Sequence, residues 1–118
     1  MSLSIHLENG TSYEPGSEVR GRVEWQAVAE RPKAVLISLL WHTEGKGTED
    51  IEILEQVEVE HPPAVGSRDF TFRLPDFPWS FSGTLVSLIW AIEASVEPDG
   101  TVERVGLVSA PGAEEIRL

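Results

Sequence analysis

The sequence has 118 residues, of which 41% are apolar and 25% charged, with a formal net charge of −11 at pH 7 and no cysteine. This length and composition fit one domain, residues 1–118, with a core that needs no disulfides. The lack of cysteine excludes thiolate metal sites and cysteine nucleophiles. Two lysines and seven scattered arginines make no basic footprint, so we expect neither nucleic acid nor a membrane as a partner.

No apolar run approaches the ~20 residues that a membrane-spanning helix needs. The first ten residues, MSLSIHLENG, have neither the basic start nor the apolar stretch of a secretory signal peptide. We therefore expect a cytoplasmic protein without membrane insertion. The excess of carboxylates favours solubility, and attraction to a basic partner protein is the alternative interpretation.

In chain order, the first expected strands are a short one at 3–7 and a longer one at 19–27. Residues 19–27 alternate between apolar or glycine and polar positions, which is typical of a half-buried strand with Val19, Val23 and Trp25 inward. Two later segments, AVLISLLW at 34–41 and TLVSLIWAIEASV at 84–96, are apolar on both faces. Such runs are typical of central strands.

The remaining expected strands are 51–59, 68–74, 102–109 and 114–118. The alternating pattern at 51–59 has these apolar members on one face: Ile51, Ile53, Val57 and Val59. At 68–74 they are Phe70, Phe72 and Leu74. Asn-Gly, Pro-Gly and Asp-Gly pairs separate the strands. Because no segment shows a helical period, the sequence predicts an all-β sandwich of two antiparallel sheets with seven to eight strands.

Four motifs follow one another along the chain: YEPGSEVRGRVEW (13–25), VLISLLWHTEG (35–45), FTFRLPDFPWSFSG (70–83) and LIWAIEASVEP (88–98). Together they resemble the N-terminal domain of arrestin-like proteins over roughly residues 3–98. The matching positions are Tyr13, Pro15, Gly16, Val19, Gly21, Val23, Phe70, Phe72, Leu74, Pro75, Pro78, Ser80, Phe81, Gly83, Glu93 and Ala94. The resemblance implies an immunoglobulin-like, arrestin-type sandwich and a binding or scaffold role toward a partner protein of unknown identity.

The sequence departs from that family in two respects. It has one copy of the sandwich, whereas typical arrestins join two. It also has no lysine or arginine before Arg20, where receptor-binding arrestins hold phosphates with basic residues. Phosphate recognition needs such a cluster, so the resemblance does not extend to that activity.

The aromatic, proline-containing segment 70–83 connects two expected strands. In the similar proteins it is the corner where a strand leaves one sheet and crosses to the next. Pro75 favours an extended Leu74, and we expect Phe77, Trp79 and Phe81 to close the open end of the sandwich. The residues of this structural corner are Phe70, Phe72, Pro75, Pro78, Trp79 and Phe81. An aromatic platform for a ligand is the alternative interpretation.

No group of residues in the sequence indicates catalysis. The histidines are scattered, at His6, His42 and His61, and there is no phosphate-binding loop or complete calcium loop. We therefore expect no enzyme activity, no catalytic residue, no cofactor and no metal. A lectin-like or small-ligand-binding sandwich is the alternative function. Trp79 is its candidate residue, because the other three tryptophans fall on faces assigned to the core.

The two-sided strands carry the candidate interaction surface. If Trp41 and Trp90 face the core, period-two geometry turns other apolar residues outward, and an immunoglobulin-like topology places these two strands side by side. The predicted interface residues are Leu36, Leu40, Leu85 and Ile89. An exposed apolar patch indicates an interface, and self-association of two copies is its simplest use. Cover by the C-terminal strand or a long loop is the alternative.

Overall fold

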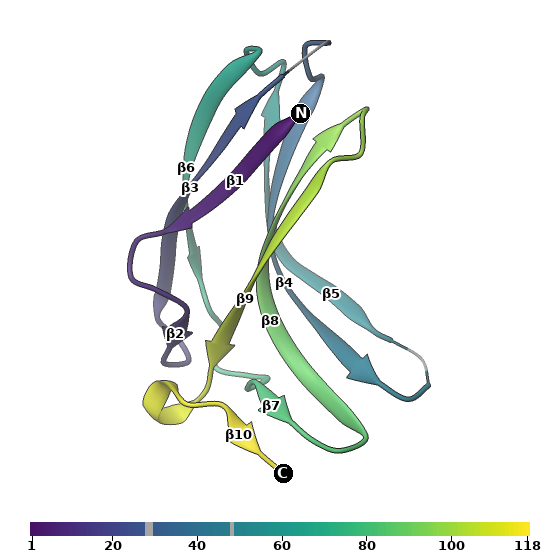
Figure 1. Ribbon diagram of the computed structural model, residues 1–118. Coiled ribbons are helices and arrows are strands. Elements are labelled where there is room, and N and C mark those ends of the chain that lie inside the picture. The colour runs from purple at the N-terminus through teal and green to yellow at the C-terminus, as the bar shows by residue number, and fades with distance from the viewer. Residues whose placement is uncertain (28–29, 48) are drawn as a thin grey trace.

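Two β-sheets pack face to face in the computed structural model, which describes residues 1–27, 30–47 and 49–118 (Figure 1). The small sheet has the strand order β1 (Ser2–Leu7), β3 (Glu18–Gln26), β6 (Val65–Arg73). The large sheet runs through β10 (Ile116–Arg117), β7 (Phe81–Ser82), β8 (Val86–Glu97), β4 (Ala34–Gly45) and β5 (Ile51–Glu60). In addition, β9 (Val102–Ser109) pairs with β8, and β2 (Ser12–Tyr13) pairs with β9.

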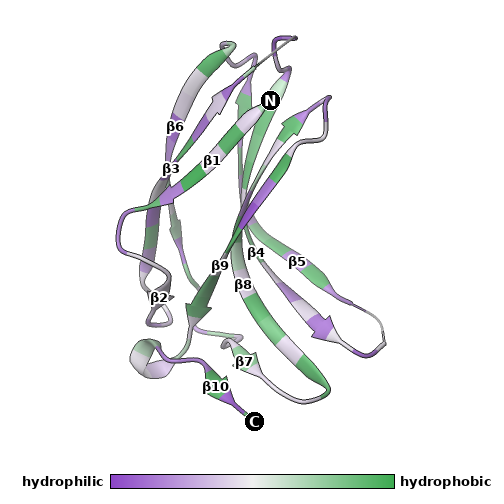
Figure 2. Ribbon diagram, viewed as in Figure 1, coloured by the Kyte–Doolittle hydropathy of each residue, from purple (hydrophilic) through white to green (hydrophobic). Residues whose placement is uncertain are grey.

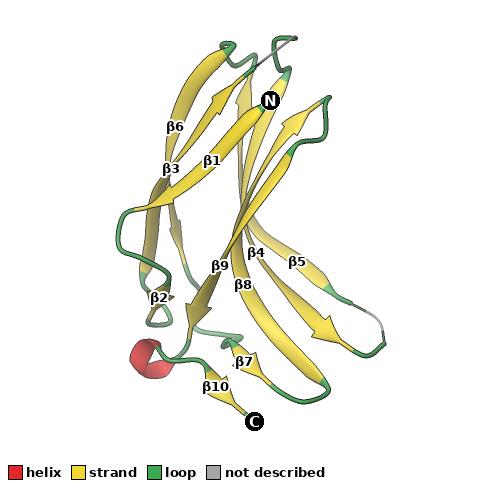
Figure 3. Cartoon of the chain, in the orientation of Figure 1, coloured by secondary structure: helices red, strands yellow, loops and turns green. Residues whose placement is uncertain are grey.

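The all-β sandwich predicted from the sequence is confirmed. Within the described residues the one helical element is the single turn η1 (Pro111–Ala113) (Figure 3). These residues form ten strands rather than seven or eight, because three of them, β2, β7 and β10, are only two residues long. The short pairs β2–β9 and β7–β10 are parallel, whereas antiparallel sheets were expected. No helix in the described ranges is long and apolar enough to span a membrane.

The small sheet turns its apolar side chains inward in the predicted alternation. Val19, Val23 and Trp25 of β3 are buried, and Figure 2 shows apolar and polar bands alternating along β1. β3 pairs with β6 so that Gly21 lies opposite Phe70. A Cβ atom at Gly21 would lie 2.7 Å from Phe70 Cζ, so the glycine makes room in the core for the phenylalanine ring.

The two strands that are apolar on both faces are central, as predicted. β4 and β8 pair side by side and antiparallel along their full lengths, with Trp41 opposite Trp90. β5 pairs with the other edge of β4, and β9 pairs with the other edge of β8. The inward side chains Ile37, Leu39 and Ile92 are fully buried in the core between the sheets.

β5 departs from its predicted pattern at a β-bulge. The sequence alternation placed Ile51, Ile53, Val57 and Val59 on one face. Instead, the register with β4 shifts in mid-strand: Val57 lies opposite the inward Ile37, whereas Ile53 lies opposite the outward Leu40. Leu54 is the extra residue of β5 between the two paired stretches. One extra residue exchanges the faces of the strand beyond it, so the first half of β5 turns its isoleucines away from the core.

The corner between β6 and β7 contacts the core through part of its aromatic side chains. Phe70 and Phe72 are buried, and their ring centroids lie 5.4 Å apart. Trp90 of β8 donates its Nε1–H to the Pro78 carbonyl oxygen at 2.8 Å, which ties the corner to the large sheet. The half-buried members of the corner are Pro75, Pro78, Trp79 and Phe81.

Phe77 does not close the end of the sandwich, and the expectation that it does is wrong. Its side chain is 68% exposed and stacks on Trp79, with ring centroids 5.2 Å apart and planes inclined by 22°. Trp79 in turn donates its Nε1–H to the Asp76 carbonyl oxygen at 2.7 Å. The two rings therefore form an exposed aromatic pair at the surface of the corner.

Candidate interaction surface

The outer face of the large sheet turns away from the small sheet (Figure 1). Four neighbouring strands, β5, β4, β8 and β9, contribute side chains to it. On β4 the outward positions alternate with the buried Ile37 and Leu39. The partner strands place their own outward residues opposite them. Because opposite residues in a ladder share a face, the outward side chains form rows that cross the strands.

One of these rows is polar and crosses the middle of the sheet. It consists of Gln56 of β5, Ser38 of β4, Glu93 of β8 and Arg104 of β9. Gln56 donates from Nε2 to the Ser38 hydroxyl oxygen at 2.9 Å. Arg104 donates to the Glu93 carboxylate at 3.0 Å. The polar groups of this row are therefore hydrogen-bonded to their neighbours, and the row divides the outer face into two halves.

The half that contains the C-terminal part of β4 is apolar. Its first row holds Ile53, Leu40, Ala91 and Gly106, and its second row holds Ile51, His42 and Ile89. We name Leu40, Ile51, Ile53, Ile89 and Ala91 the apolar patch. The isoleucines of β5 are 56% and 53% exposed at positions 51 and 53, whereas Leu40 and Ala91 are 0% exposed and form the floor of the patch.

The four residues predicted as an interface lie on this face but do not form one exposed surface. Leu40 needs a correction, because Ile53 and Ala91 flank it on both sides and leave it buried. Leu36 is half-buried and lies across the polar row from the patch. Leu85 is 67% exposed and precedes β8, where its carbonyl oxygen accepts a hydrogen bond from the Lys46 amide at 3.2 Å. Of the four, Leu40 and Ile89 belong to the patch, and of these two only Ile89 is partly exposed.

Sequence reasoning missed Ile51 and Ile53, the most exposed members of the patch. It placed both on one face with Val57 and Val59, because the four residues lie at alternate positions. The available signal is the pair Leu54 and Glu55, an apolar and a charged residue that both fall out of phase with the alternation. A bulge at that point turns the apolar residues before it and the apolar residues after it to opposite faces of the strand.

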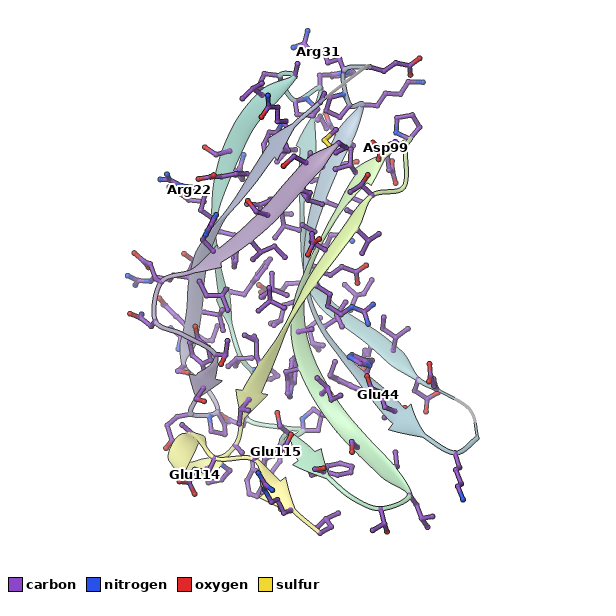
Figure 4. The ribbon with its side chains drawn as sticks, in the orientation of Figure 1. Arg22, Arg31, Glu44, Asp99, Glu114 and Glu115 are labelled. Carbon is purple, nitrogen blue, oxygen red and sulfur yellow. The ribbon has the colours of Figure 1, made fainter. Side chains whose placement is uncertain are left out.

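The hairpin that carries Ile51 and Ile53 is strongly acidic. Between residues 34 and 60, which span β4, its turn and β5, the sequence has a single lysine, Lys46, and no arginine. The acidic residues there are Glu44, Glu49, Asp50, Glu52, Glu55, Glu58 and Glu60. Glu44 lies on the hairpin of β4 and β5 (Figure 4). Its carboxylate is 3.9 Å from Nδ1 of His42, a side chain that is 14% exposed and lies between Ile51 and Ile89 in the second row.

The outer face of the small sheet has the opposite character. A cleft of about 520 Å³ lies on it, lined largely by charged and polar side chains. Arg22 points away from the large sheet (Figure 4) and donates to the Asp69 carboxylate at 2.8 Å. This hydrogen bond holds the pKa of Asp69 below its usual value. Arg20 and Arg73 both bind Glu18, so the charges on this face are paired.

Histidine and acidic side chains do not gather into a metal-binding cluster in the described part of the chain. No group of three His, Asp or Glu side chains there could hold a metal ion. His6 and His42 lie on different sheets, and His61 follows β5 at its C-terminal end. The histidines therefore do not converge on one site.

Comparisons with known proteins do not show a family. No family model matches the chain, and no curated protein matches it. Among the solved structures that do match is a β-glucosidase from Listeria innocua in complex with gluconolactone. The TM-score is 0.46 and the sequence identity 12%, over 92% of this chain and 16% of that chain.

This similarity corrects one expectation drawn from the sequence, namely that the chain is not an enzyme. The structure it is similar to is that of an enzyme, so the expectation is withdrawn. A likeness at this identity and TM-score assigns no activity to the chain. The arrestin-like resemblance and the cytoplasmic location stay predictions.

Proposed function

We propose that the chain is a protein-interaction module with an arrestin-type sandwich that docks a partner through the apolar patch. The observation that carries the proposal is the exposure of Ile51 and Ile53 on the same face as a buried apolar floor. The bulge in β5 is what brings them there. A strand that kept its alternation would have buried both residues against the core.

The physical argument concerns water. Two large aliphatic side chains, each more than half exposed, keep apolar surface in contact with solvent. The neighbouring floor of Leu40 and Ala91 makes this surface continuous with a packed layer rather than isolated. Removing such a surface from water stabilises a complex, and the polar row with Gln56 and Arg104 bounds the area that a partner would cover.

A second candidate function rests on the stacked pair of Phe77 and Trp79. An exposed aromatic face can bind a sugar ring or another flat ligand. The pair is fixed by the hydrogen bond from Trp79 to the Asp76 carbonyl oxygen. We rank it second because no enclosed pocket with converging polar groups accompanies the two rings among the clefts described for this chain.

Site-specific photo-cross-linking in the native host tests the docking function. A benzophenone amino acid replaces Ile53 in one variant and Val65 in a matched control, since both are exposed β-branched residues on edge strands. We expect a discrete cross-linked product at position 53 and none at position 65. Equal products at both positions, or none at position 53, would overturn the proposal. Sedimentation of the purified chain tests self-association through the same face.

A further inference from the structure

β5 is an open edge of the large sheet. Among the residues that the structure describes, β5 pairs with β4 alone. Most of its side chains are exposed, and only Val57 and Val59 are half-buried. The backbone N–H and C=O groups on the free side of such a strand can pair with a strand from another chain. The apolar patch begins at this edge, because two of its members, Ile51 and Ile53, belong to β5.

We propose that β5 accepts an added strand from a different protein, a segment in which apolar and basic side chains alternate. This inference rests on the proposed docking function and names the occupant of the same surface. The added strand extends the large sheet by one position beyond β5. Its apolar side chains enlarge the patch, and its basic side chains meet the carboxylates of β5.

The alternation follows from the two faces of β5. In its first half the outward residues are Ile51 and Ile53, which share the face of Leu40. Glu52 lies opposite Trp41 and Glu55 lies opposite Leu39, so both belong to the other face. Side chains of an added strand stand beside the residues of β5 on the same face. An apolar residue therefore fits beside Ile51 and Ile53, and a basic residue fits beside Glu52 and Glu55.

Charge decides between a different protein and a second copy of the chain. A symmetric contact between two β5 edges brings the carboxylates of both strands together, and like charges across an interface oppose association. The only positive side chain between residues 34 and 60 is Lys46, which is too few to compensate. A basic segment is attracted to the carboxylates of β5, whereas a second copy is repelled by them. Salt screens this attraction and weakens it.

A synthetic decapeptide of alternating lysine and valine is the probe, with binding measured by calorimetry and by amide chemical shifts of the labelled protein. We expect shifts concentrated in β5 and an affinity that falls about tenfold or more as salt rises from 50 to 500 mM. Two control peptides separate the contributions. Alternating glutamate and valine removes the charge match. N-methylation of alternate residues of the lysine peptide removes backbone pairing but keeps its charge.

Both control peptides should bind at least about tenfold more weakly than the lysine peptide. Equal binding of the N-methylated peptide would show non-specific attraction to acid and overturn strand addition. Equal binding of the glutamate peptide would overturn the basic partner. Concentration-dependent sedimentation that Ile53→Ser abolishes would identify a second copy as the occupant instead.

Variants of the protein complete the test. Glu52→Gln with Glu55→Gln should weaken binding of the lysine peptide several-fold. The matched control, Glu103→Gln with Glu114→Gln, makes the same change in net charge at exposed positions outside β5 and should leave binding nearly unchanged. Equal losses in both double variants would overturn the site.

If position 53 cross-links a partner in the host but the lysine peptide does not bind, the proposed basic strand is wrong and the docking function stands. If neither occurs, both are wrong.

Discussion

The outer faces of the two sheets expose different kinds of side chain to water. The outer face of the small sheet carries three arginines and three carboxylates: Arg20, Arg22, Arg73, Glu18, Glu24 and Asp69. Ion pairs there join β3 to β6 at Arg22 with Asp69 and at Arg73 with Glu18. The large sheet instead carries an apolar patch on its outer face, and the hairpin of β4 and β5 at its edge has seven carboxylates and one lysine.

The difference indicates which face is complete in the single chain. Paired charges are well hydrated and leave little for a partner to gain, because exposed ion pairs contribute little energy in either direction. An apolar surface beside an excess of carboxylates favours binding of a partner that covers the apolar area and neutralises the negative charge. We therefore infer that the outer face of the small sheet stays in contact with solvent and that the outer face of the large sheet binds a partner.

The largest expected effect concerns the core that both sheets share. Phe72→Ala should lower the free energy of unfolding by about 3–5 kcal/mol, because it leaves a cavity at a side chain that is 2% exposed. Its neighbour Thr71 faces outward on the same strand, so Thr71→Ala is the control and should change stability by less than about 0.5 kcal/mol. Urea denaturation of both variants measures the difference. Similar losses would show that the faces of β6 are misassigned.

A second prediction tests the buried floor of the apolar patch. Leu40→Ala should cost about 2–5 kcal/mol although Leu40 lies on an outer face, since its side chain is enclosed by Ile53 and Ala91. Leu85→Ala is the control, an exposed leucine beyond the end of the same face, and should change stability by less than about 0.5 kcal/mol. Thermal and urea unfolding measure both. A cost below about 1 kcal/mol for Leu40→Ala would contradict the packed floor.

Two glycines sharpen the comparison between the sheets. Gly21→Ala should destabilise the small sheet by about 1–3 kcal/mol, because the new methyl group would overlap the Phe70 ring and the His6 carbonyl oxygen. At Gly106, on the outer face of the large sheet, a Cβ atom would meet Ile89 Cγ2 at an ordinary 3.9 Å. Gly106→Ala should therefore be neutral or slightly stabilising. Equal shifts of the urea midpoint in Gly21→Ala and Gly106→Ala would contradict this prediction.

Much of the fold could be predicted from the sequence because period two is a strong local signal. The alternation in β3 determined which side chains enter the core, and the two-sided runs of β4 and β8 determined the central pair. The exposed isoleucines of β5 could not be predicted in this way. Their face depends on one extra residue, Leu54, and on a register with β4 that is a long-range property. The local trace of the bulge is the pair Leu54 and Glu55, which both break the alternation.

The candidate site was predictable in part for the same reason. Pairing of β4 with β8 followed from topology, and Ile89 was correctly placed on the outer face. The burial of Leu40 was not predictable, because it depends on Ile53 from a third strand. The exposure of Phe77 was missed as well. An aromatic residue between two prolines gives no sequence signal for whether its ring meets the core or stacks on another exposed ring.

The smallest expected effect is electrostatic and lies on the small sheet. The hydrogen bond from Arg22 lowers the pKa of Asp69 in the folded chain. A carboxyl whose folded pKa lies below its unfolded value stabilises the fold above that unfolded value, about 3.9 for aspartate. The stabilisation is lost as pH falls through the lower, folded pKa. Because both side chains are well exposed, solvent screens the pair and its share of stability is small.

Arg22→Gln removes the donor and should raise the Asp69 titration midpoint toward the ordinary value, as measured by carboxyl carbon NMR. Arg117→Gln is the control, because it removes one exposed positive charge from β10 in the large sheet. It should leave the midpoint of Asp69 where it is. An equal rise in both variants would mean that Asp69 responds to net charge and not to its hydrogen bond. The pairing of Arg22 with Asp69 would then be non-specific, and the ion pairs of Glu18 with Arg20 and Arg73 would be the remaining specific pairing on the outer face of the small sheet.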